Sequence, residues 1–186
     1  MKRLLDILIL ILILLPILVI SILIAMTILI YCGLPIFYCS DRIGLNGKIF
    51  KMPKFRTMNV DAPNIATHLI ENPQKYITRV GGVLRKSSLD EIPQLWCIVK
   101  GEMSFVGPRP ALIGQDELIA ARQKKGINMI TPGLTGWAQV NGRDSLTIQE
   151  KVAYDEEYLE KKSIIFDFKI LLITFKKVLL KKDISH

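Results

Sequence analysis

The hydrophobic and polar positions of this chain divide it into an apolar N-terminal run and a mixed remainder. Between Ile7 and Ile30 the only polar side chains are the hydroxyls of Ser21 and Thr27, and the next charge is Asp41. A helix of this length measures roughly 36 Å and would cross the hydrocarbon core of a bilayer, which is about 30 Å thick. The run is too long for a secretory signal peptide, and no small-residue cleavage site follows it. The pattern therefore predicts a membrane helix.

Two features argue against a plain spanning helix. Pro16 lies inside the run, where it removes a backbone donor and kinks a helix. Basic residues flank both ends of the run, so the positive-inside bias holds both ends in the cytoplasm. A helix that enters one leaflet, bends near Pro16 and returns has legs of roughly 15 to 21 Å and satisfies both features. We expect residues 1–35 to form either this re-entrant helix or a span, and residues 36–186 to form a cytosolic, membrane-associated domain.

The remainder of the chain predicts a small sheet and several helices. The pair Asn46-Gly47 is a turn signal between two short runs with β-branched and aromatic residues, which predicts a β-hairpin. Thr147 and Glu150 have the spacing of a capping box, which predicts a helix that runs to about Lys161.

From residue 163 to residue 182, apolar side chains recur at helical spacing and lysines are available to the opposite face. Such a helix either lies in the membrane interface and meets anionic lipid or packs on the domain core. The expected fold class is α/β and mostly helical, with a re-entrant membrane helix hairpin, a small β-hairpin or sheet, and amphipathic interfacial helices.

Charge and composition narrow the class of partner. The 186 residues are 50% hydrophobic and carry a formal net charge of +8, which suits one modest domain attached to a membrane. Positive charge suits nucleic acid, anionic lipid or a polyanionic small molecule. The sequence has no zinc-finger spacing, no ribonucleoprotein aromatic motif and no basic region running into heptads, so nucleic acid is not expected. Cys32, Cys39 and Cys97 form no CxxC pair, which indicates a reducing, cytosolic setting.

Two adjacent carboxylates, Asp90 and Glu91, stand in a strongly basic stretch. Ser88 and Glu91 have the spacing of a capping box, so one interpretation is that Glu91 closes the N-terminus of a helix that runs to Lys100 and stops at Gly101. The other interpretation is chemical, because adjacent carboxylates can divide labour: one attacks a phosphorus atom while the other holds a cation. Such an attack requires that the repulsion between anions is neutralised, which magnesium and arginines would do. The spacing leaves both interpretations open.

Basic side chains around this pair are candidates for phosphate recognition. Lys54 and Arg56 would point to one face of a strand, a pattern that is also typical of an ordinary solvated face. Gly107 and two prolines stiffen the loop around Arg109, and a rigidly held guanidinium suits bidentate phosphate binding. Residues 131–143 combine turn residues with amides and another arginine, as a candidate floor for a nucleotide or a sugar.

Four motifs taken together resemble one family. They are KFRTM at 54–58, LRKSSLDEIPQLW at 84–96, MSFVGPRP at 103–110 and PGLTGWAQVNGR at 132–143. In their order and spacing, and with the N-terminal helix, they resemble the monotopic phosphoglycosyl transferases, the bacterial sugar transferase family, over nearly the whole chain. The resemblance favours the catalytic interpretation of the carboxylate pair.

The resemblance implies transfer of a sugar 1-phosphate from a UDP-sugar to undecaprenyl phosphate, with release of UMP, at the cytoplasmic face of the bacterial inner membrane. It implies that Asp90 is the nucleophile of a ping-pong mechanism with a covalent aspartyl-phosphosugar intermediate, and that Glu91 binds Mg²⁺. The implied phosphate-binding residues are Lys54, Arg56, Arg85 and Arg109, and the implied substrate- or nucleotide-binding residues are Gln139, Asn141 and Arg143.

The resemblance also implies a monotopic, re-entrant helix that breaks at Pro16, although the residue before this proline is Leu15 where relatives often have serine. The chain is similar to the small members that transfer N,N'-diacetylbacillosamine 1-phosphate in protein glycosylation, so an N-acetylated amino sugar is expected. Two alternatives stay open. One is a non-catalytic membrane adaptor that binds anionic lipid, and the other is direct displacement with the carboxylates as metal ligands only. The identity of the sugar and the oligomeric state are not predicted.

Overall fold

The structure is a computed structural model that describes residues 2–63, 70–142 and 145–180. Most of these residues are helical and the strands are short, in agreement with the expected fold class. The helices are α1 (Lys2–Cys32), α2 (Arg79–Ser87), α3 (Leu95–Lys100), α4 (Asp116–Lys124), α5 (Trp137–Val140), α6 (Ile148–Lys161) and α7 (Ile164–Leu180). The strands are β1 (Phe37–Ile43), β2 (Ile49–Phe55), β3 (Ser104–Val106), β4 (Ala111–Leu112) and β5 (Gly133–Thr135), and short 3-10 helices are η1 (Leu45–Gly47), η3 (Pro73–Lys75), η4 (Leu89–Gln94) and η5 (Ile127–Met129).

The predicted hairpin is confirmed by β1 and β2, which pair antiparallel and end with Ile43 opposite Ile49. Residues 44–48 join the two strands through η1, where Asn46 adopts a left-handed conformation with φ of 54°. The Asn-Gly signal marks this turn, but the loop is longer than a two-residue turn. β4 pairs with the other edge of β1, and β3 pairs in parallel with β5 in a second small sheet.

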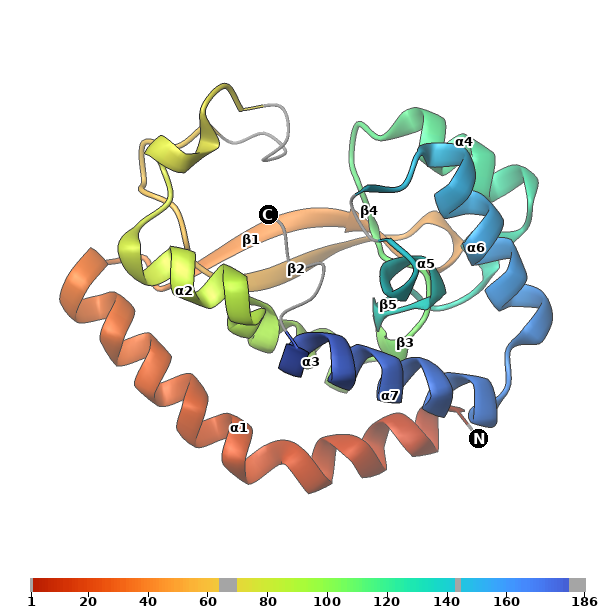
Figure 1. Cartoon of the computed structure of the whole chain (residues 1–186), viewed down its shortest axis with the longest axis horizontal. Helices are drawn as coiled ribbons and strands as arrows, with labels where there is room; N and C mark the ends of the chain where they lie inside the picture. The colour runs from red at the N-terminus through yellow and green to blue at the C-terminus, as the bar shows by residue number, and fades with distance from the viewer. Residues whose placement is uncertain (1, 64–69, 143–144, 181–186) are drawn as a thin grey trace.

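The predicted N-terminal apolar helix is present as α1, which contains Pro16 and bends in its middle (Figure 1). Its most apolar window has a mean hydropathy of 3.6, and only a small part of that window is buried inside the molecule. Length and composition therefore allow α1 to cross or to enter a membrane.

Both ends of α1 contact the remainder of the chain. At the N-terminal end, Lys2 forms an ion pair with Asp167 of α7, and the buried carboxylate of Asp6 accepts a hydrogen bond from the Ser104 hydroxyl at 3.0 Å. Near the other end, Ile28 is completely buried in a cluster with Phe55 of β2 and Leu84 of α2. The helix thus runs along one side of the domain with both of its ends attached to it (Figure 1).

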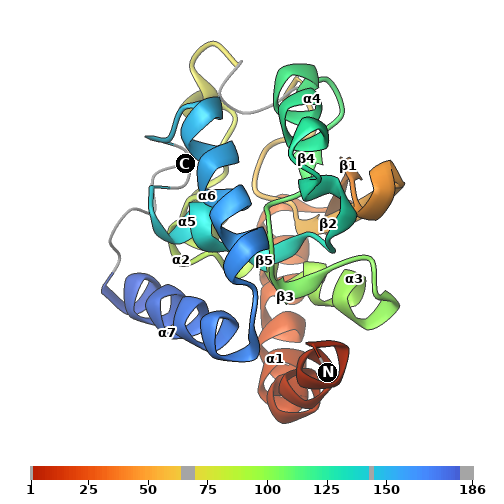
Figure 2. The same cartoon turned by 90° about the vertical axis from the view of Figure 1, so that its right-hand side faces the viewer.

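The main hydrophobic core lies between the hairpin, α3, β3 and the C-terminal helices. Its buried members are Phe50, Met52, Cys97, Ile98, Met103, Phe105, Val106, Val140, Tyr158 and Ile170. α7 packs Ile170 into this core but leaves Ile165 84% and Phe175 63% exposed. One stripe of this C-terminal helix therefore packs on the core, as one of the two interpretations predicts. Another stripe stays exposed, and its contact with a membrane interface stays a prediction. Figures 1 and 2 show α7 on the same side of the molecule as α1.

Two predicted helix boundaries are confirmed. At the start of α6, the Thr147 hydroxyl accepts from the Glu150 amide at 3.2 Å and the Glu150 carboxylate accepts from the Thr147 amide at 2.8 Å, which is the expected capping box. α3 ends at Lys100, and Gly101 follows in a left-handed conformation with φ of 82°.

Candidate active site

The carboxylate pair lies in η4, between α2 and α3. Ser88 ends α2 in a left-handed conformation with φ of 56°, and its side chain makes no capping hydrogen bond to η4. The capping interpretation of Glu91 is therefore wrong. The physical reason is that the turn that begins at Ser88 is a 3-10 turn entered from a left-handed residue, so the Ser88 hydroxyl does not cap it.

The Glu91 carboxylate instead binds two cations that come from distant parts of the chain. Its Oε1 accepts hydrogen bonds from Lys54 Nζ of β2 and from Arg109 Nη2 of the loop after β3, both at 2.7 Å. Lys54 Nζ is also 3.9 Å from Oδ2 of Asp90. Two of the predicted phosphate-binding residues, Lys54 and Arg109, thus contact one carboxylate pair, and charge-assisted hydrogen bonds of this length fix their geometry.

Asp90 is only 3% exposed, and its Oδ1 has no hydrogen-bond partner among the described residues. Burial raises the pKa of Asp90 above its ordinary value, and it outweighs the opposing attraction of Lys54 and Arg85. Burial likewise lowers the pKa of Lys54, against the attraction of Glu91. A desolvated carboxylate with one unpaired oxygen, held beside cations, is suited to nucleophilic attack on a phosphorus atom.

Arg85 is placed at the same site through a residue that the sequence did not single out. Its Nε donates to the Thr57 hydroxyl at 2.9 Å, and it lies close enough to Asp90 to stabilise that carboxylate electrostatically. α2 approaches the Thr57 main chain so closely that a Cβ on Gly81 would lie 2.0 Å from the Thr57 oxygen. Thr57 lies in the KFRTM motif, but its contact with Arg85 depends on the packing of α2 against the end of β2, which the motif does not reveal.

Arg56 is placed elsewhere. Its Nη2 donates to the main-chain oxygens of Cys32 at 2.6 Å and Gly33 at 2.8 Å, at the C-terminal end of α1, and its side chain is buried there. A cation at this end of a helix satisfies carbonyls that lack intrahelical partners. Lys54 and Arg56 therefore do not act together in this structure: Lys54 reaches the carboxylate pair and Arg56 caps the C-terminal end of α1.

The predicted substrate segment near α5 is described in part. The Gln139 amide is buried without a hydrogen-bond partner among the described residues. A Cβ on Gly136 would lie 2.1 Å from the Gly107 oxygen, so this segment packs directly on the loop that carries Arg109. Asn141 is exposed and donates to the Trp137 oxygen at 2.7 Å. Arg143 lies outside the described residues, so the predicted role of this segment stays a prediction.

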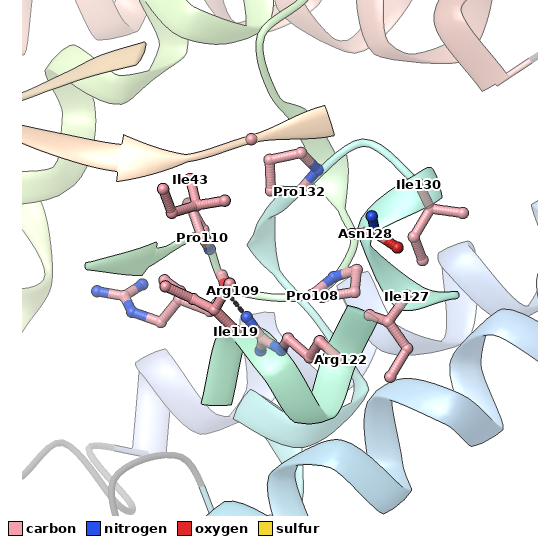
Figure 3. Close-up of a pocket in the computed structure, with 12 residues that line it drawn as sticks. Ile43, Pro108, Arg109, Pro110, Ile119, Arg122, Ile127, Asn128, Ile130 and Pro132 are labelled. Atoms are coloured by element: carbon pink, nitrogen blue, oxygen red, sulfur yellow. Dashed lines mark hydrogen bonds between the residues drawn. The ribbon is translucent and has the colours of Figure 1, made fainter. Parts of the chain in front are cut away.

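A small pocket lies behind the same loop, apart from the carboxylates. Apolar side chains line most of it, including Ile43, Ile119, Ile127 and Ile130 (Figure 3). The Arg109 guanidinium points out of this pocket, and its Nη2 reaches Glu91.

The carboxylate pair can accommodate Mg²⁺ in the way that proteins usually bind it. Mg²⁺ is commonly held by one or two carboxylates together with substrate phosphates, so a cage of protein ligands is not required. The described residues contain no cluster of three His, Cys, Asp or Glu side chains. Asp90 has an unpaired buried oxygen, and Glu91 is its neighbour. The carboxylate oxygens of Asp90 and Glu91 thus fit a cation whose coordination is completed by the phosphate oxygens of a substrate.

The site thus combines two buried carboxylates with an excess of cations, next to a helix that is long and apolar enough to enter a membrane. Residues 1–181 match the family described as bacterial sugar transferase, and the chain belongs to this family.

Several named relatives are similar to this chain. It is 39% identical over 154 residues to the uncharacterized sugar transferase EpsL of Bacillus subtilis, which covers 83% of this chain and 75% of the relative. It is 38% identical over 158 residues to the UDP-glucose:undecaprenyl-phosphate glucose-1-phosphate transferase of Escherichia coli and 37% identical over 166 residues to the UDP-galactose-lipid carrier transferase of Erwinia amylovora. These matches cover 80% and 81% of this chain but only 33% and 34% of the two relatives.

Proposed function

We propose that this protein transfers a sugar 1-phosphate from a UDP-sugar to undecaprenyl phosphate and releases UMP. The observation that carries the proposal is the convergence of Lys54 and Arg109 on the carboxylate pair, in a chain with an apolar helix docked against the same domain. The names of the Escherichia coli and Erwinia amylovora relatives describe transfer of sugars to lipid carriers, which supports the same reaction class.

In the proposed mechanism Asp90 is the nucleophile. Its carboxylate attacks the β-phosphorus of the UDP-sugar, the bond from that phosphorus to the bridging oxygen breaks, and UMP leaves with the bond electrons. An aspartyl-phosphosugar remains. A phosphate oxygen of undecaprenyl phosphate then attacks the same phosphorus, forms the lipid diphosphosugar and regenerates the Asp90 carboxylate, which makes the reaction ping-pong.

The cations of the site bind and orient the diphosphate. Lys54 and Arg109 lie where they can contact its oxygens, and Arg85 stands beside Asp90. Glu91 orients both Lys54 and Arg109, and together with the substrate phosphates it would hold Mg²⁺. When bound, Mg²⁺ would neutralise phosphate charge that otherwise repels the attacking carboxylate.

We further propose that α1 is re-entrant and holds the domain on the cytoplasmic face of the bacterial inner membrane. A straight span would carry the two ends of α1 to opposite sides of the bilayer. Lys2 pairs with Asp167, and Arg56 caps the other end of α1 at Cys32, so both ends are bound by one domain. The bend at Pro16 and the basic residues at both ends support the same topology.

The proposed sugar is an N-acetylated amino sugar, and the proposed pathway is the assembly of a glycoconjugate such as a protein-linked glycan. The sequence resemblance to small family members supports this choice. The names of two relatives above contain glucose and galactose. A donor panel must therefore contain UDP-hexoses as well as UDP-N-acetylhexosamines.

The test is mass spectrometry of the purified protein, quenched after mixing with Mg²⁺ and a panel of UDP-hexoses and UDP-N-acetylhexosamines, without lipid acceptor. We expect a mass increase of one phosphosugar that maps to Asp90. The variant Asp90→Asn should form no adduct, and Asp116→Asn, at an exposed carboxylate of α4, should behave like the wild type. UMP release with lipid acceptor but without any adduct would contradict the covalent route. No UMP release from any donor would contradict the transferase and favour a membrane adaptor.

A further inference from the structure

A buried ion pair joins α4 to α6 behind the candidate active site. Asp155 of α6 is 1% exposed, and its Oδ2 accepts from Arg122 Nε at 2.9 Å and from Arg122 Nη2 at 2.6 Å. Arg122 of α4 is also buried. Burying two charges is costly, and well-packed apolar residues often stabilise a fold as well as such a pair does. The stability of the fold therefore does not by itself explain this buried ion pair.

The third guanidinium nitrogen of Arg122 contacts residues 107–110, the loop between β3 and β4 that carries Arg109 and is called the active-site loop below. Its Nη1 donates to the main-chain oxygen of Arg109 at 2.7 Å, the contact drawn as a dashed line in Figure 3. The side chain of Arg109 reaches Glu91 on the other side of the loop. One chain of hydrogen bonds thus runs from Asp155 through Arg122 and Arg109 to the carboxylate pair.

The carbonyls on either side of Arg109 are also held. The oxygen of Pro108 accepts from the Gly133 amide at 2.9 Å, and the oxygen of Pro110 accepts from Arg42 Nη1 at 3.3 Å. Because proline has no N–H, the segment 108–110 can be fixed by the main chain mainly through its carbonyls. Arg122 supplies the central one of these three contacts.

We propose that Arg122, oriented by Asp155, is a positioning residue that holds the Arg109 main chain so that the Arg109 guanidinium meets the substrate diphosphate. This role rests on the proposed function. Catalytic groups must be held close to their productive geometry, and a misplacement of about 1 Å can reduce a rate by about 100-fold. Arg122 acts through Arg109 and makes no contact with the reacting atoms.

The test compares two double variants of the full-length protein. Arg122→Met/Asp155→Leu replaces the buried pair with apolar side chains of similar size, so that neither charge is left unpaired. The control, Lys125→Met/Glu156→Gln, removes an ion pair of 2.9 Å at the surface, which connects the end of α4 to α6 without touching the loop. The measurements are the melting temperature, hydrogen exchange of peptides covering residues 105–112 and 148–161, and kcat/KM for UMP release from the best donor of the panel.

For the buried double variant we expect faster exchange in residues 105–112, unchanged exchange in α6 and a fall in kcat/KM of about 10- to 100-fold. The control should match the wild type in all three measurements. In an Arg109→Met background the same double substitution should change kcat/KM by less than about threefold, because two residues that act as one unit are not additive.

Unchanged exchange in residues 105–112 would overturn the proposal, and so would a full loss of rate that persists in the Arg109→Met background. Faster exchange with unchanged kcat/KM would also overturn it, since the loop would then not need to be held. If the wild type releases no UMP from any donor, the proposed function fails, and the exchange of residues 105–112 alone decides whether Arg122 positions the loop.

Discussion

Glu91 and Arg109 are joined by a hydrogen bond of 2.7 Å from Nη2 to Oε1, although they are 18 positions apart in the chain. Lys54 donates to the same carboxylate oxygen from β2. One oxygen therefore connects the hairpin, η4 and the loop after β3. This arrangement ties the geometry of the cations to the charge of Glu91, and the first two predictions depend on it.

The variant Glu91→Gln should retain its fold and lose activity. The Gln oxygen can still accept hydrogen bonds, but Lys54 and Arg109 would lose the negative charge that orients them. We expect UMP release to fall by about 100-fold, the range found when one preorganised electrostatic contact is removed. The matched control is Glu117→Gln at an exposed position of α4. A rate within twofold of the wild type, with Mg²⁺ saturating, would contradict the role given to Glu91.

The pH dependence of kcat/KM should be bell-shaped. The attacking carboxylate must be ionised, and burial raises the pKa of Asp90, so activity falls on the acid side at a pH above the ordinary value of 3.8. Lys54 must be protonated, and burial lowers its pKa, so activity falls on the basic side at a pH below 10.5. The variant Lys54→Arg should move the basic limb to higher pH, because a guanidinium keeps its proton. A basic limb that is identical in this variant would assign that limb to another group.

Gly81 and Gly82 offer a matched pair of substitutions in one helix. A Cβ on Gly81 would meet the Thr57 main chain at 2.0 Å, whereas a Cβ on Gly82 would meet only a side-chain carbon of Ile77 at 3.9 Å. We expect Gly81→Ala to lower the free energy of unfolding by about 1–3 kcal/mol or more, because α2 must move away from Thr57. Gly82→Ala should raise it by about 0.5–1 kcal/mol through helix propensity.

Denaturant unfolding in detergent measures both changes. The displacement of α2 should also reduce activity in Gly81→Ala, since Thr57 holds Arg85 beside Asp90. Equal stabilities of the two variants would show that α2 does not press on the Thr57 main chain.

The three cysteines should differ in their reactivity towards thiol reagents. Burial raises the pKa of the Cys97 thiol to about 11, whereas Cys39 lies exposed on β1. At pH 8 about one Cys97 thiol in 10³ would be ionised, and the thiolate is the reactive form. We expect Cys39 to react first and Cys97 only after unfolding, as followed by peptide mapping after alkylation. Rapid labelling of Cys97 in the folded protein would contradict the packing of α3 on the core.

Several elements could be predicted because their signals are local. The apolar run predicts α1, the Asn46-Gly47 pair predicts the turn between β1 and β2, and the capping box predicts the start of α6. In each case neighbouring residues in the chain supply both the signal and the interactions. The same reasoning failed for Ser88, where the residue before the turn is left-handed and the expected cap does not form.

In the candidate site, too, some features could be predicted from neighbouring residues and others depend on how the elements pack. Asp90 and Glu91 stand out in the sequence as adjacent acids in a basic stretch, and Lys54, Arg85 and Arg109 are visible as nearby cations. Which of the cations meet the carboxylates was not visible. Lys54 reaches Glu91, whereas Arg56, two residues later, is turned to the end of α1.

The sequence by itself determined the long apolar helix, the hairpin, the capped helix and the chemical identity of the acidic pair, since periodicity, turn residues and charge act over a few neighbouring positions. Only the tertiary structure decided that Arg109 and Lys54 share one oxygen of Glu91, that Thr57 holds Arg85, and that Arg122 supports the active-site loop. These contacts join elements that are far apart in the chain, and they depend on how the elements pack, which no local pattern encodes.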